Sequence, residues 1–451
     1  MSARGSDRVR GDGSALRVLL VAYAWPPTGG VGTGRVLKLA KYAADHNLQP
    51  SVLTVSNPSV PLIDPSLLRD VPAGIEVIRA RTLEPGYASK AAVWREASSQ
   101  AGQGGLRLKS RIRSLARQLL VPDPQVLWQP AAAVALARRL RSPDAEDVVF
   151  ITAPPFSSFL AGPLTRLRRG TALVLDYRDE WSTVRSSYEM SGRLAASAGA
   201  ALERRVVRYA HAITVATEAF RDHLLANIPT LDPARVHVIP NGYDPDDFPP
   251  GLPDPPSDRF VLTYAGTVYR LTSARGLLAA VRLLHEGNPD LARRLHVRFV
   301  GRIVETEADA FDGMERYGVE RIGFLPKDQV MPELAASHMT LVLHAHATGT
   351  ERIYPAKVFE LMHLGRPVLA ITPRGVLSAL VERHRLGHVF DPDDVPAIAA
   401  FLDRSLRDFC AGRYVSKVAA VDTGRFHRRA LAGEFAAVFR AAAGLARANA
   451  V

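Results

Sequence analysis

Lys357 and Glu360 are the residues whose types and spacing most clearly suggest chemistry. They belong to residues 349–371, which the sequence predicts to be a loop, a short helix, a sharp stop and a buried strand. Lys357 falls in the first turn of that helix, where free N–H groups and the helix dipole favour an anion. Glu360 follows one turn later as a fixed acceptor. A nucleotide sugar needs both, because its diphosphate requires cations and its ribose hydroxyls require an acceptor.

Local signals define the helix that carries this pair. Pro355 suits the first helical position, because its fixed φ fits a helix and no partner is lost with its missing N–H. Apolar side chains recur on one side, at Val358, Leu361 and Met362. Gly365 is placed to cap the end in a left-handed conformation, before a strand at residues 368–371. The alternative is an amphipathic core helix with an ordinary surface ion pair.

Length and composition limit the class of protein. A chain of 451 residues is expected to form two or three domains. The single cysteine, Cys410, excludes an internal disulfide framework and a four-cysteine zinc site. We expect Cys410 to be a small buried side chain and the location to be a reducing cytoplasm.

The net charge of +12 favours an anionic partner. Aromatic residues make up only 7% of the chain and arginines are not interleaved with them, so no nucleic-acid partner is expected. The chain lacks the run of about 18 apolar residues that a membrane span requires. We reject residues 16–25 as a signal peptide, because they contain a buried first strand, and we interpret residues 1–15 as a disordered tail.

Apolar runs of strand length alternate with helical patterns along both halves of the chain. This βαβ rhythm predicts an α/β fold with doubly wound parallel sheets. The expected strands are residues 17–23, 50–55, 75–79, 147–152, 173–175, 211–217 and 236–240 in the first half, and 260–265, 297–300, 321–325, 340–343 and 368–371 in the second. The sequence also predicts a helix at residues 218–227. Prolines crowd residues 244–258, which no helix or central strand tolerates, so this segment is the expected linker.

A glycine-rich loop follows the first strand. Gly29, Gly30 and Gly32 would allow the backbone to approach a ligand closely at a helix N-terminus. Arg35 stands where a dinucleotide fingerprint needs glycine and where a P-loop needs lysine, so neither motif is present. The alternative is a tight turn without a ligand.

The segment Pro-x-Lys-x-x-Glu, ending at Glu360 and followed by Gly-Arg-Pro-Val-Leu-Ala, resembles the donor-binding signature of retaining GT-B glycosyltransferases of family 4. The resemblance implies two Rossmann-like domains facing across a cleft. The acceptor domain would be residues 16–243 and the donor domain residues 259–425. Residues 426–451 would form a helix that crosses back to the first domain.

The resemblance also assigns roles to individual residues. It implies catalytic roles for Glu360, Lys357 and Arg275, with Glu360 holding the donor's ribose. The first Glu of the family's Glu-x7-Glu motif is not matched, because Arg352 occupies its position and Glu351 lies one place away. The implied donor-binding residues are Gly29, Gly30, Gly32, Gly266, Arg270, Arg275, Phe324, Leu325, Arg352, Ile353, Tyr354, Pro355, Ala356, Lys357 and Glu360. Arg270 and Arg275 have an alternative interpretation as ordinary surface arginines.

Two polar loops follow strands of the first half and resemble loops in one branch of the family. They supply the acceptor-side candidates, Pro155, Ser157, Arg178 and Asp179. Arg178 and Asp179 have the alternative of pairing with each other, and Asp179 that of a structural role. The resemblance implies no metal and no cofactor, the nucleoside diphosphate sugar being a substrate and a hydroxyl-bearing molecule the acceptor.

Residues 106–120 predict a helix with leucines on one face and lysines and arginines on the other. Such a helix can bind the anionic inner face of the cell membrane, although an ordinary domain helix with a solvated basic face shows the same pattern. Two alternatives to the transferase remain open. They are a GT-B nucleotide-sugar epimerase that uses the same diphosphate site, and a catalytically inactive partner-binding subunit.

Overall fold

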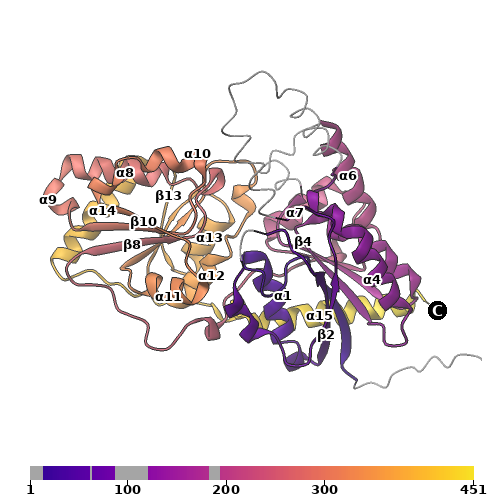
Figure 1. Ribbon diagram of the computed structural model, residues 1–451. Coiled ribbons are helices and arrows are strands. Elements are labelled where there is room, and N and C mark those ends of the chain that lie inside the picture. Colours follow the sequence, from indigo (N-terminus) through magenta and orange to yellow (C-terminus); the bar gives the residue numbers. More distant parts are fainter. Residues whose placement is uncertain (1–13, 61–62, 87–119, 182–192, 451) are drawn as a thin grey trace, which may run out of the picture.

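The computed structural model describes residues 14–60, 63–86, 120–181 and 193–450. These residues form two α/β domains, one from each half of the chain (Figure 1). All but the last residue of the basic segment 106–120, and most of the predicted N-terminal tail, lie outside the described residues. No helix within the described ranges is both long and apolar enough to span a bilayer.

In the described part of the chain, the first domain contains a seven-stranded sheet in the order β3-β2-β1-β4-β5-β6-β7. All neighbouring strands are parallel. The strands are β1 (Leu16–Val21), β2 (Leu48–Val55), β3 (Glu76–Ala80), β4 (Val148–Ala153), β5 (Ala172–Tyr177), β6 (Ala212–Val215) and β7 (Val236–Val238). The helices of this half are α1 (Val31–Lys41), α4 (Gln129–Arg141), α6 (Arg193–Val207) and α7 (Glu218–Asn227).

The second domain contains, among the described residues, a six-stranded parallel sheet in the order β10-β9-β8-β11-β12-β13. Its strands are β8 (Phe260–Ala265), β9 (Leu295–Val300), β10 (Val319–Gly323), β11 (Met339–Leu343), β12 (Val368–Ile371) and β13 (Gly387–Phe390). The helices are α8 (Arg275–Gly287), α9 (Pro289–Ala292), α10 (Glu305–Ala308), α11 (Lys327–Ala335), α12 (Lys357–Leu364), α13 (Val376–Arg383) and α14 (Val395–Cys410), followed by the C-terminal helix α15 (Arg428–Ala448).

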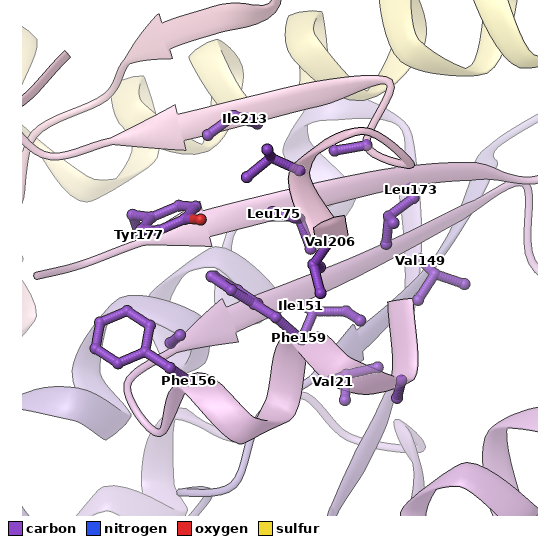
Figure 2. Close-up of a cluster of buried hydrophobic side chains, with 14 of the residues drawn as sticks. Val21, Val149, Ile151, Phe156, Phe159, Leu173, Leu175, Tyr177, Val206 and Ile213 are labelled. Atoms are coloured by element: carbon purple, nitrogen blue, oxygen red, sulfur yellow. The ribbon is translucent and has the colours of Figure 1, made fainter. Parts of the chain in front are cut away.

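The central strands β4, β5 and β6 are buried along their whole length, which explains why they are mostly apolar. On one face, Phe159 and Tyr177 pack with ring centroids 4.7 Å apart. Figure 2 shows these rings beside Ile151 and Leu175. The other face is covered partly by α15, whose Phe439 joins the same apolar cluster as β1 and β4. The last helix of the chain therefore completes the core of the first domain, as its position in Figure 1 also shows.

The chain passes between the domains twice. Residues 248–259 form neither helix nor strand after the short 3-10 helix η7 (Pro245–Asp247). The second passage follows α14, and there the N–H of Tyr243 donates to the carbonyl of Phe426 at 2.9 Å. The two connecting segments thus contact each other.

The predicted pair of Rossmann-like parallel-sheet domains is confirmed. The bounds of α7, β8 and β12 are those that local sequence signals predicted. Two expectations were wrong in detail. Cys410 is exposed rather than buried, because it is the last residue of α14 and lies beyond the buried part of the helix, which ends at Leu406. Helix α12 begins at Lys357 rather than Pro355, because Pro355 forms the preceding turn and its carbonyl accepts from the N–H of Val358 at 3.0 Å.

We predict that Phe439→Ala destabilises the protein by about 3–5 kcal/mol, the usual range for removing a fully buried aromatic ring. Phe439 is 0% exposed, and its ring lies 5.3 Å from that of Phe150. The measurement is urea unfolding followed by circular dichroism. Leu445→Ala is the matched control on the same helix, since Leu445 is 52% exposed and its loss should change stability by less than about 0.5 kcal/mol. Equal effects of the two variants would show that α15 is not part of the core.

Candidate functional site

Arg352, one of the predicted site residues, lies at the boundary between the domains, where strands of the first sheet end. Glu180 follows β5 and Thr217 follows β6 in the first domain. Arg352 lies in the second domain, just before α12, and it contacts both of them. Ligands of open α/β sheets bind at the carboxyl ends of the strands, so this is the expected edge of each sheet.

Helix α12 is positioned by signals on both sides. Gly349 has a φ of 93° and begins the turn of η11 (Thr350–Arg352) before the helix. Gly365 ends the helix with a φ of 72°, a left-handed conformation that glycine adopts without strain. The apolar face is buried through Val358, Phe359, Leu361 and Met362. Lys357 and Glu360 are only partly buried.

The structure brings Lys357 together with Gly266, which follows β8. The Nζ atom of Lys357 lies 3.8 Å from the centroid of the Tyr264 ring. A Cβ atom at Gly266 would lie only 2.2 Å from that Nζ, so glycine is required there for this lysine position. Lys357 forms no ion pair within the described ranges. Its ammonium lies over the Tyr264 ring, and its predicted role in binding an anion stays a prediction.

The positive charge of Lys357 also acts on His344, which follows β11. Burial, together with Lys357, lowers the pKa of His344 to about 4. The Nδ1 atom of His344 is buried without a hydrogen-bond partner among the described residues. His344 is therefore neutral at physiological pH and adds no charge to the site.

Glu360 is held by a residue that the sequence did not indicate. Its Oε1 atom lies 3.1 Å from the Nζ of Lys327, the first residue of α11. The same Nζ lies 2.7 Å from Oδ2 of Asp247 in the linker. Phe324 and Leu325 lie in the loop between β10 and α11, and Phe324 is 54% exposed. The loop with these two predicted donor-binding residues thus leads directly into α11, the helix whose Lys327 contacts Glu360.

Arg352 connects the domains. Its guanidinium forms a two-pronged ion pair with Glu180, with Nε–Oε1 and Nη2–Oε2 distances of 2.5 and 2.8 Å. Its carbonyl accepts from the hydroxyl of Thr217 at 2.8 Å. Arg352 also pairs with Glu351. The side chain at the unmatched position of the Glu-x7-Glu motif therefore binds a carboxylate from the other domain.

Three further donor-side candidates follow Arg352 along the chain. Ile353 continues the turn, with its N–H donating to Thr350, and Ala356 is the N-cap of α12. Tyr354 lines a cavity of about 140 Å³ at the domain boundary together with residues of both domains, including Glu218. Burial and the charge of Glu218 raise the pKa of Tyr354 to about 12. Its side chain thus reaches a different space from the one beside Lys357.

The glycine loop is tied to the acceptor-side loop by Arg178. The guanidinium of Arg178 donates to the carbonyls of Gly32, Ala153 and Pro154. A Cβ atom at Gly32 would lie 2.5 Å from Nη1 of Arg178, so the close approach requires glycine. Arg178 thus connects backbone segments and forms no ion pair with Asp179 within the described ranges.

The remaining loop candidates have the following positions. Gly29 lies in the loop before α1, and Gly30 caps that helix with a φ of 97°. Pro155 precedes η5 (Phe156–Leu167). The N–H of Ser157 donates to Asp123 at 2.9 Å, while its hydroxyl is buried without a partner among the described residues. Burial raises the pKa of Asp179.

Arg270 and Arg275 are not joined to the group around Lys357. Arg270 is exposed in a turn after β8. Arg275 begins α8, and its guanidinium forms a two-pronged ion pair with Asp309 at 3.0 and 2.5 Å. Half of the Arg275 side chain is exposed. This pairing agrees with the alternative of surface arginines. The donor-binding role of Arg270 and Arg275 stays a prediction.

One group of side chains in the described ranges could hold a metal ion. The ligand atoms of His346, Asp391 and Asp393 all lie within 4.8 Å of one another, and the three residues are exposed. The ring of His346 lies 2.9 Å from Asp391, and this hydrogen bond raises the pKa of His346 and lowers that of Asp391. The ion pair between His346 and Asp391 explains why these side chains lie close together. Metal independence stays a prediction.

Comparison with known proteins gives matches in both halves of the chain. Residues 28–247 match the family described as Glycosyltransferase Family 4, and residues 259–408 match Glycosyl transferases group 1. The α-maltose-1-phosphate synthase of Mycolicibacterium smegmatis is 30% identical over 187 residues, which is 38% of this chain and 46% of the relative. A D-inositol 3-phosphate glycosyltransferase of Catenulispora acidiphila is 34% identical over 186 residues, 40% of this chain and 42% of the relative. Each match thus spans less than half of the curated relative.

Solved structures resemble the whole chain. The sucrose-phosphate synthase of Thermosynechococcus elongatus has a TM-score of 0.60 at 16% identity, covering 94% of this chain and 98% of that one. HepE of Anabaena, in complex with UDP and glucose, has a TM-score of 0.55 at 15% identity, covering 96% and 99%. At these identities the likeness establishes the fold.

We predict strong coupling between Arg352 and Glu180 in a double-mutant cycle with Arg352→Met and Glu180→Gln. Glu180 is only 2% exposed, so removing the arginine alone takes a two-pronged ion pair from a buried carboxylate and should cost about 3 kcal/mol. We expect a coupling free energy of about 1–3 kcal/mol from urea unfolding. The control pair, Arg407 and Asp403, is exposed on α14 and should couple by only about 0.3–0.5 kcal/mol. A coupling no larger than the control would mean that the pair does not join the domains in solution.

Proposed function

The chain belongs to the group 1 glycosyltransferases of the GT-B fold, and on this premise we propose that it transfers a sugar from a nucleoside diphosphate sugar to a hydroxyl group with retention at the anomeric carbon. The observation that carries the proposal is the ammonium of Lys357. It lies at the start of α12, against Gly266, and no carboxylate of the described residues neutralises it. A diphosphate placed there would meet a cation and the positive end of a helix.

The chemistry follows from what this arrangement stabilises. Negative charge on the diphosphate grows as the sugar departs, so the charge of Lys357 acts more strongly on the transition state than on the bound donor. We propose no nucleophile from the protein. The oxygen of the leaving diphosphate can accept the proton of the incoming hydroxyl on the same face, and this route gives retention.

The second domain would hold the rest of the donor. Glu360 offers a partly exposed carboxylate to the ribose hydroxyls, one turn along α12 from Lys357. Arg352 and Glu180 lie at the start of the same segment, where the sugar would meet the first domain. The ligand in the HepE structure, UDP with glucose, is consistent with a donor of this class.

The first domain would present the acceptor. Arg178 joins the loop containing Gly32 to the loop that precedes Ser157, so both loops would move as one wall of the acceptor site. We propose a small-molecule, lipid-linked or polysaccharide acceptor. Peripheral contact with the inner face of the membrane through residues 106–120, and a cytoplasmic location, stay predictions.

We predict that a nucleoside diphosphate raises the Tm of the wild-type protein. A ligand present at 100 times its Kd stabilises the folded state by about 2.7 kcal/mol. Lys357→Ala and Glu360→Ala should lose most of the gain, because they remove the cation and the hydroxyl acceptor. The measurement is a thermal-shift screen against UDP, GDP, ADP and TDP with their sugars.

Lys417→Ala and Glu286→Ala are the charge-matched controls, because both side chains are exposed on the second domain. Lys417 precedes Val418, which bonds to Gly365 at the opposite end of α12 from Lys357. Both controls should keep the full shift. Equal stabilisation of the site variants and the wild type would remove Lys357 and Glu360 from the donor site. A screen in which no nucleoside diphosphate shifts the wild type would contradict the proposed function itself.

We also predict that transfer proceeds without a metal ion and conserves the anomeric configuration of the donor. Activity in EDTA should equal activity in buffer, and NMR of the product should show the same anomer as the donor. The variant His346→Ala removes the group of side chains that could hold a cation and should keep full activity. Loss of activity in EDTA, or an inverted product, would overturn the corresponding part of the mechanism. Release of an isomerised sugar nucleotide without acceptor would indicate an epimerase instead.

A further inference from the structure

We infer that Lys327 is a positioning residue that fixes the carboxylate of Glu360. Through Asp247, Lys327 also connects this carboxylate to the first domain. The inference rests on the proposed function, in which Glu360 binds the ribose. Lys327 lies between the two carboxylates, 3.1 Å from Glu360 and 2.7 Å from Asp247. It belongs to neither α12 nor the linker but to α11, which brings a third segment to the site.

The location of Lys327 is unfavourable without these two partners. It is the first residue of α11, where the positive end of the helix dipole opposes a cation. Burial also disfavours the ammonium, but the carboxylates of Glu360 and Asp247 outweigh burial and raise the pKa of Lys327. The lysine therefore stays charged, and the two carboxylates are what keep it in place.

Asp247 is a linker residue that is fixed against the first domain. It is only 4% exposed, and its Oδ1 lies 2.7 Å from the Nζ of Lys38 on α1. Lys38 in turn pairs with Asp70 and Asp244 at 2.7 and 2.6 Å. Burial alone would raise the pKa of Asp247, but Lys327 and Lys38 lower it below its usual value. Asp247 is therefore ionised, and Lys38 holds it against α1.

Glu360 retains capacity for a ligand after pairing with Lys327. A carboxylate has about four lone-pair sites, and one ammonium contact occupies one of them. No other residue of the described ranges pairs with Glu360, and its side chain is 26% exposed. The lysine thus fixes the rotamer of Glu360 and leaves oxygen lone pairs for two neighbouring hydroxyls. This separates the role of Lys327 from a direct contact with the donor.

The test compares ribo and 2′,3′-dideoxy nucleoside diphosphates by isothermal titration calorimetry, using the base selected in the thermal-shift screen. The wild type should bind the ribonucleotide at least about tenfold more tightly than the dideoxy compound, the usual effect of hydrogen bonds to a charged group. Lys327→Met should reduce this ratio to about threefold or less and leave the affinity for the dideoxy compound within about twofold. A purely structural role would weaken both ligands equally and leave the ratio unchanged.

Three variants make the outcome specific. Lys327→Arg should restore most of the ratio because it keeps the charge, while Lys417→Met makes the control change at an exposed lysine and should leave the ratio unchanged. Glu360→Gln should abolish the ratio. If Glu360→Gln abolishes it and Lys327→Met keeps it, the inference is wrong and the proposed function stands. If the wild type binds neither nucleotide, the proposed function fails.

Discussion

The buried charge cluster around Lys38 is the constraint on which the arrangement of the two domains depends. The side chains of Lys38 and of its partners Asp70, Asp244 and Asp247 are each no more than 5% exposed. Removing such ions from water costs several kcal/mol for each, which only close pairing with opposite charges offsets. The beginning of the linker therefore has one favourable position, against α1. The linker can reorient the second domain only beyond Asp247.

The second domain contacts the first domain and the linker through the segment that contains α12. One end of the α12 segment meets the first domain through Arg352 and Glu180, and its middle meets the linker through Glu360, Lys327 and Asp247. Lys357 lies between these contacts and takes part in neither. The residues that would hold the donor and those that join the domains thus alternate along one short segment. A change in domain orientation must move the donor site with it.

Local order could be predicted from the sequence, because its signals lie within a few residues of one another. Gly365 ends α12 where a left-handed cap was expected, and the apolar run of β12 has its predicted bounds. The long-range pairs could not be predicted. Arg352 and Glu180 are separated by 172 positions, and Lys327 and Asp247 by 80. Only the folded sheets bring such charges together, and no local pattern distinguishes them from solvated surface residues.

The unmatched position in the Glu-x7-Glu motif is a further case in which the sequence did not reveal a long-range pair. The sequence indicated a missing carboxylate, since Arg352 stands where the family resemblance implies glutamate. The structure shows that Arg352 is surrounded by two carboxylates, Glu351 from its own turn and Glu180 from the other domain. An acid is therefore present at this end of the site, but it is bound through an arginine and shared with the domain boundary. A sugar that binds there must compete for the same charges that join the domains.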